Sequence, residues 1–157
     1  MSTIRVDTRQ MDAASVEALL TKHHVGSMAL AFHDRVTISL VNYVYAKRWI
    51  YARLEDGPDL ATVQHHRWVA FEVSEIGGIY DWRSVTVRGS VEFLPHDGTG
   101  VVKREFDAAV DLLRSAVPAV FTKRDPMPQR VQLIRIHVDE LIGRQSRSNA
   151  PADLPPA

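Results

Sequence analysis

The sequence of 157 residues contains no cysteine. This absence excludes a disulfide framework, a thiolate nucleophile and a zinc site built on thiolates. It fits a reducing compartment, and we expect a cytoplasmic location. Net charge is also absent, because nineteen Lys and Arg balance nineteen Asp and Glu. No overall field therefore attracts nucleic acid or an anionic membrane.

Long apolar runs are missing as well. No stretch approaches the roughly 20 apolar residues that cross a bilayer, and the opening MSTIRVDTRQMD lacks the apolar centre of a signal peptide. We expect neither a membrane partner nor a nucleic-acid partner. The length is typical of one domain. We predict a single domain over residues 1–144 and a disordered tail over residues 145–157, which is rich in Pro, Ala and Ser.

Short segments rich in β-branched and aromatic residues, each bounded by turn-forming residues, predict strands. They occupy three successive segments within residues 25–54, and then residues 68–76, 82–94 and 130–144. Gly89 interrupts the alternation of valines in the segment 82–94. A glycine at such a position indicates a bulge or a bend.

Apolar residues at helical spacing predict three helices, over residues 12–24, 59–66 and 101–118. Asp12 stands where its carboxylate can cap the first of them. About six short strands with few long connections argue against a doubly wound parallel sheet. We therefore expect a mainly β (α+β) fold: a small antiparallel barrel with peripheral helices, which closes the sheet and removes most of its exposed edge.

The histidines form no self-sufficient metal motif. His23-His24 and His65-His66 are adjacent pairs, and adjacent residues on a helix do not share a face. We expect solvated helix ends rather than a metal site. A single histidine, His24 or His66, stays open as an axial haem ligand. The charged and proline-containing segment 123–128 is predicted to be a solvated loop.

Five segments taken in order carry a family resemblance: VGSMALAF, VNYVYAKRWIYARL, WVAFEVSEI, DWRSVTVRGSVEF and LIRIHVDELIGR. They resemble the pyridoxamine 5'-phosphate oxidase-like superfamily with its FMN-binding split-barrel fold, and within it the nitroimidazole-reductase-like branch. The resemblance spans approximately residues 15–144. It implies a homodimer that binds FMN in a cleft between two protomers. It also implies a flavin-dependent oxidoreductase that acts on a small organic molecule.

The resemblance also implies which residues bind the cofactor. The strand through Asn42 would lie along the isoalloxazine ring, and Arg53 would approach the phosphate. The full implied set is Val41, Asn42, Tyr43, Tyr51, Arg53, Asp59, Leu60, Trp82, Arg83, Ser84 and Val85. The strand pattern alone gives another interpretation, in which the aromatic members are ordinary half-buried strand residues. We assign no catalytic residue, because the hydride chemistry belongs to the flavin.

The residues after Gly57 depart from the family pattern. FMN-binding relatives usually carry a basic residue there that holds the phosphate, whereas this chain has Pro58-Asp59. A carboxylate facing a phosphate dianion is repulsive in a partly desolvated site. Three alternatives are open: Arg53 and the helix starting near Asp59 hold the phosphate; the cofactor is the deazaflavin F420 or haem; or the site holds no cofactor. The rival function is a non-catalytic flavin-, F420- or haem-binding module.

Overall fold

Helices and strands form close to the positions that the sequence predicts. The computed structural model describes residues 3–149. In chain order its elements are β1 Val6–Gln10, α1 Ala13–Lys22, β2 Val25–Phe32, β3 Arg35–Ala46, β4 Trp49–Leu54, α2 Pro58–His65, β5 Trp68–Ile76, β6 Trp82–Leu94, α3 Val101–Ala116 and β7 Gln132–Ser148. The predicted segments 68–76 and 82–94 are β5 and β6 without change.

Six of the strands close into a ring. Their order is β7-β4-β3-β2-β5-β6, and β6 pairs back to β7. Every neighbouring pair in the ring is antiparallel. The predicted antiparallel barrel of about six strands with peripheral helices is therefore confirmed. The strand β1 was not predicted; it pairs with the far end of β7, outside the ring.

The last strand is longer than the predicted boundary at residue 144. β7 continues to Ser148, which lies opposite Val6 of β1. Ser146 is buried, and its hydroxyl donates to the carbonyl oxygen of Tyr80 at 2.7 Å. Backbone pairing with β1 and β6 orders residues 145–148 although their side chains are polar. Their assignment to a disordered tail was wrong, and residues 150–157 lie outside the described part of the chain.

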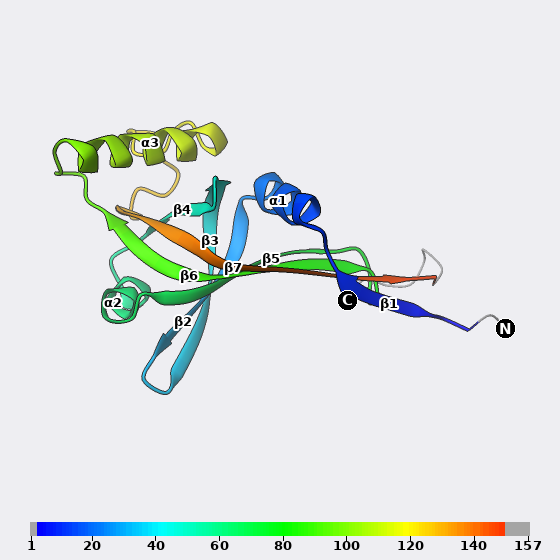
Figure 1. Cartoon of the computed structure of the whole chain (residues 1–157). Coiled ribbons are helices and arrows are strands. Elements are labelled where there is room, and N and C mark those ends of the chain that lie inside the picture. The colour runs from blue at the N-terminus through cyan, green and yellow to red at the C-terminus, as the bar shows by residue number, and fades with distance from the viewer. Residues whose placement is uncertain (1–2, 150–157) are drawn as a thin grey trace.

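Two apolar clusters lie on opposite sides of the barrel wall. The first fills the barrel interior and includes Leu20, Tyr43 and Phe71. The second lies outside the barrel, where α3 packs against it, and includes Val44 and Leu113. Figure 1 shows α3 over one end of the barrel and the β2–β3 hairpin pointing away from it. The described helices include none that is long and apolar enough to span a bilayer.

Two local features of the fold, the start of α1 and the irregularity in β6, follow from single residues. Asp12 caps α1 as predicted, because its carboxylate accepts a hydrogen bond from the backbone N–H of Ser15 at 2.8 Å. The pairing of β6 with β7 shifts register between Arg88 and Gly89, so the predicted irregularity at Gly89 is confirmed. A Cβ at Gly89 would overlap the carbonyl oxygen of His137. Only glycine lets the two strands approach this closely.

We predict that Gly89→Ala destabilises the fold by about 2 kcal/mol or more, because the backbone of β6 or β7 must move to accept the methyl group. Gly77→Ala is the matched control, since the nearest atom to its added Cβ is the carbonyl oxygen of Asp81 at 3.5 Å, an ordinary contact distance. Urea unfolding followed by circular dichroism measures both. Equal midpoints for the two variants would contradict the close approach at Gly89.

Candidate functional site

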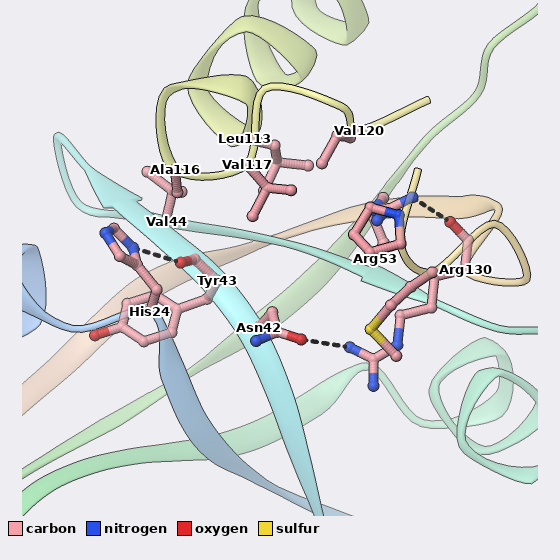
Figure 2. Close-up of a pocket in the computed structure, with 12 residues that line it drawn as sticks. His24, Asn42, Tyr43, Val44, Arg53, Leu113, Ala116, Val117, Val120 and Arg130 are labelled. Carbon is pink, nitrogen blue, oxygen red and sulfur yellow. Dashed lines mark hydrogen bonds between the residues drawn. The ribbon is translucent and has the colours of Figure 1, made fainter. Parts of the chain in front are cut away.

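A cavity of about 240 Å³ lies between the barrel wall and the C-terminal half of α3. One wall is apolar and belongs to the end of α3 and the residues after it. In Figure 2 these side chains point toward β3. The apolar lining consists of Val44, Leu113, Ala116, Val117, Val120, Pro126 and Met127. The cavity is thus a gap in the second apolar cluster, open at its polar end.

The alternation of β3 decides which of its residues reach this cavity. Val41, Tyr43 and Tyr45 point into the barrel and are buried. The hydroxyl of Tyr43 donates to the carbonyl oxygen of Leu20 at 2.7 Å, and burial raises its pKa. The alternate residue Asn42 is exposed and lines the cavity. Alternate residues of β3 therefore contribute to the barrel core and to the lining of the cavity.

Two polar side chains stand at the mouth of the cavity. The Nη1 of Arg130 donates to Oδ1 of Asn42 at 3.2 Å, as Figure 2 shows. The Nδ1 of His24 lies 3.1 Å from the carbonyl oxygen of Tyr43. Because a carbonyl oxygen can only accept, Nδ1 carries the hydrogen. In the neutral ring, Nε2 of His24 then keeps a free lone pair.

A buried ion pair fastens the loop that follows α3. The guanidinium of Arg53 donates to both carboxylate oxygens of Asp125, at 2.7 and 3.1 Å, and to the carbonyl oxygen of Arg130 at 3.1 Å. The two side chains are only 8% and 1% exposed. Asp125 also accepts from the backbone N–H groups of Phe121 and Met127. The prediction that residues 123–128 form a solvated loop was wrong at Asp125, because its carboxylate organises the turn.

A second hollow, of about 150 Å³, adjoins the cavity at Arg53 and Arg130. It lies between the open edge of β3 and the start of α2. Its lining is Leu40, Val41, Arg53, Leu54, Glu55, Gly57, Pro58, Asp59 and Arg130. Within residues 3–149, neither of its two carboxylates forms an ion pair, and no carboxylate lies within ion-pair distance of Arg130.

Part of the implied cofactor-binding set meets at this site. Asn42, Tyr43 and Arg53 line the cavity, and Val41, Arg53 and Asp59 line the adjoining hollow. Two further members are buried in the barrel core, namely Leu60 and Val85. Tyr51 packs against the second apolar cluster. The sequence did not single out the α3 wall or Arg130, and no local pattern distinguishes them from an ordinary amphipathic helix and its loop.

The Trp82-Arg83-Ser84 segment lies elsewhere in the protomer. None of these residues lines the cavity or the hollow. The Nη2 of Arg83 donates to Glu75 at 2.9 Å, and Trp82 pairs across the sheet with Ile76. Within one chain they are separate from the site. They can contact a molecule bound in a cavity only when that cavity belongs to a second copy of the chain.

An exposed apolar surface continues outward from the cavity along the outer face of β3. Its large side chains are Val36, Ile38, Leu40 and Trp68, which are 72%, 71%, 69% and 61% exposed. Between them lies a shallow hollow, to which β2 and β5 contribute the small residues Ser27, Ala29 and Ala70; Ile38, Phe71, Glu72 and Thr86 complete its lining. We call this surface the outer β3 face. Its β3 members occupy the same alternation as Asn42, so the face ends at the mouth of the cavity.

The comparisons with known proteins now identify the family. A sequence profile described as pyridoxamine 5'-phosphate oxidase matches residues 12–145. The chain belongs to this family. Among curated proteins no relative matches. The fold is shared with a FAD-binding protein from Mesorhizobium loti, at 25% identity and a TM-score of 0.71, covering 91% of this chain and 99% of that one.

Two solved structures of lower sequence identity also share the fold. One is a protein from Bacteroides thetaiotaomicron with a provisional assignment to 5-nitroimidazole antibiotic resistance, at 17% identity and a TM-score of 0.72, covering 96% of this chain and 97% of that one. The other is a FAD- and haem-binding protein from Mycobacterium smegmatis, at 15% identity and a TM-score of 0.64, covering 88% and 73%. The split-barrel fold and the resemblance to this superfamily are thereby confirmed.

We predict that Asp125→Asn lowers the free energy of unfolding at pH 7 by about 3–5 kcal/mol, the usual cost of breaking a buried pair. The hydrogen bond from Arg53 is the main cause that lowers the pKa of Asp125 to about 2, and backbone N–H groups of Met127 and Phe121 contribute. A lowered pKa stabilises the fold above the ordinary value of 3.8, and this contribution is lost as the pH falls toward 2.

Urea unfolding at several pH values between about 2 and 7 measures both effects. The wild type should lose stability below pH 4 more steeply than Asp125→Asn. Glu140→Gln is the matched control, because its partner Arg88 at 3.2 Å and Glu140 itself are both more than half exposed. Its change should stay below about 1 kcal/mol. An unaltered midpoint for Asp125→Asn at pH 7 would show that the pair does not fasten the loop.

Proposed function

We propose that the protein binds a flavin in the cavity beneath α3 and uses it as an oxidoreductase on a small organic molecule. The observation that carries the proposal is an apolar wall on α3 facing the polar edge of a strand. A flavin ring has apolar faces and a rim of hydrogen-bonding atoms, so it suits this arrangement. Together the cavity and the hollow reach the lower end of the range of roughly 300–1,000 Å³ typical of small-molecule sites.

The edge of β3 supports contacts to the ring. β3 pairs with β2 up to Asn42, but its pairing with β4 begins only at Tyr43. Before that point its other edge has no partner strand in the described part of the chain, so backbone N–H and C=O groups there can bind the rim of a ring. Asn42 and Arg130 add side-chain donors. A bound flavin would supply the hydride chemistry, while these residues position the ring and the α3 wall excludes water.

The residues present fit the ring but do not fit a terminal phosphate. The apolar lining suits FMN, riboflavin, FAD and the deazaflavin F420 alike, because all share the tricyclic ring. At the polar end, Arg53 is already bonded to Asp125, and Glu55 and Asp59 are negative. Flavin as a class is therefore better supported than FMN, which stays a prediction from the resemblance. A cytoplasmic location likewise stays a prediction from the composition.

We also infer a homodimer through the outer β3 face. Large apolar side chains more than half exposed, next to a hollow of small residues, form a self-complementary surface of the kind that two-fold dimers use. A second copy on this face would bring other side chains to the mouth of the cavity. Trp82 and Ser84 belong to the adjoining strand β6, on the same face as Ile76. This supports the expectation that they contact the cofactor at the dimer cleft, and we infer that the cofactor they contact is the one bound by the partner protomer.

The rival function, a non-catalytic haem-binding module, rests on one observation. His24 lines the cavity, and the hydrogen bond at Nδ1 leaves its Nε2 lone pair free to bind iron. The absorption spectrum of the untreated protein separates the two functions. A flavin spectrum that is bleached by a nicotinamide nucleotide and restored by a nitroaromatic compound supports the oxidoreductase. A Soret band that is lost in His24→Ala supports the haem module.

We predict that Val117→Trp abolishes flavin binding, because Val117 belongs to the apolar wall of the cavity and an indole there fills the space for the ring. Val101→Trp is the control; it adds the same group to the other end of α3, where the side chain is 59% exposed. Quenching of flavin fluorescence on titration measures affinity. Equal binding by both variants would place the flavin elsewhere, and no quenching by the wild type would contradict the proposed function.

We predict that Ile38→Glu converts the dimer to a monomer, because it buries a charge at the centre of the outer β3 face. Thr37→Glu provides the control. It adds the same charge to the neighbouring residue, whose side chain points to the opposite side of the strand. Sedimentation velocity measures the assembly. A dimer that persists in Ile38→Glu would exclude this face as the interface.

A further inference from the structure

The hollow beside α2 has an unusual balance of charge for a family associated with phosphorylated ligands. Two carboxylates line it, Glu55 and Asp59, and neither is neutralised by an ion pair within the described residues. Among the residues that the structure describes, the only side-chain cations lining it are Arg53 and Arg130. Which of them is available to a ligand therefore decides what the hollow can bind.

Arg53 is engaged by the loop after α3, although its Nε–H is not used in these contacts. Both terminal nitrogens of its guanidinium donate to Asp125, and Nη1 also donates to the carbonyl oxygen of Arg130. The ring of Phe121 covers one face of the guanidinium, with its centroid 4.9 Å from Cζ. Turning Arg53 toward a ligand would leave the carboxylate of Asp125, only 1% exposed, without its counter-ion. The side chain of Arg53 therefore serves to order the loop rather than to bind a ligand.

The start of α2 does not restore the missing positive charge. The N-terminal end of a helix attracts anions through its free N–H groups. Here Gly57 is the N-cap and offers no side-chain hydrogen bond, while Asp59 already places a carboxylate in the first turn. An incoming phosphate would meet this charge and that of Glu55, and within residues 3–149 Arg130 is the one lining cation not engaged by a carboxylate. A dianion is therefore disfavoured in the hollow.

We propose that the hollow takes the uncharged polyol tail of a flavin, so that the site prefers riboflavin to FMN. This inference rests on the proposed flavin function and narrows its ligand. Carboxylates accept hydrogen bonds, and the hydroxyl groups of a ribityl chain donate them. Glu55 and Asp59 are suited to bind that chain, and Arg130 stays hydrogen-bonded to Asn42 beside the ring. A terminal phosphate adds charge where the protein is already negative.

The test is a pair of fluorescence titrations of the flavin-free protein, one with riboflavin and one with FMN, at low and at high salt. Riboflavin should bind at least tenfold more tightly than FMN at low salt, which corresponds to about 1.4 kcal/mol. High salt should narrow the ratio, because it screens the repulsion. FMN binding as tightly as riboflavin or more so would overturn the inference and leave the flavin function intact.

Isosteric variants separate charge from lack of space. Asp59→Asn and Glu55→Gln remove one charge each and should reduce the riboflavin-to-FMN ratio at least threefold, mainly by tightening FMN. Asp97→Asn, in the loop before α3 and outside the hollow, is the matched control and should leave the ratio unchanged. A ratio that does not respond to Asp59→Asn or Glu55→Gln would overturn the inference. Binding of neither flavin would overturn it together with the proposed function.

Discussion

The buried pair between Arg53 and Asp125 determines the shape of the site. Arg53 projects from the outer face of β4, where it lies opposite Leu133 in the ladder with β7. The segment between α3 and β7 forms no strand or helix of its own. Asp125 supplies its order, because one carboxylate gathers the guanidinium and two backbone N–H groups. Met127 and Arg130 follow this turn and line the cavity.

The same pair limits what the site can recognise. A guanidinium whose terminal nitrogens bind a buried carboxylate has its charge largely compensated, so it attracts a phosphate less strongly, even though its Nε–H is not used in these contacts. Ordering the loop and gripping an anion therefore compete for one side chain. In this chain Arg53 is bound to Asp125 of the loop. Asp59 in the first turn of α2 acts in the same direction, so two independent features lower the positive charge at one place.

Most of the fold could be predicted from the sequence because each ring strand has one face in the barrel. That constraint imposes the alternation seen in β6, and steric limits at Gly89 mark its irregularity. The strand β1 and the end of β7 were missed for the opposite reason. All five residues of β1 are exposed, so its order comes from backbone pairing with β7, which leaves no trace in side-chain chemistry.

The site was predictable only where it lies on a strand. The resemblance singled out Asn42, which is an amide within an apolar run, and the alternation of β3 brings it to the cavity. Asp125 did not stand out, because it pairs with a residue 72 positions away and its neighbours are charged residues and prolines. A contact of that kind is set by topology, and local sequence does not contain it.

The alternation of β3 also connects assembly with binding. Ile38 and Leu40 lie on the outer β3 face, and Asn42 and Val44, two and four residues further on, line the cavity. A second copy seated on that face would therefore cover the mouth of the cavity and exclude water from a bound ring. Any ligand that contacts both copies binds the dimer more tightly than the monomer, and it must then strengthen the dimer by the same free energy. In such a dimer, ligand affinity and self-association would be linked through the single strand β3.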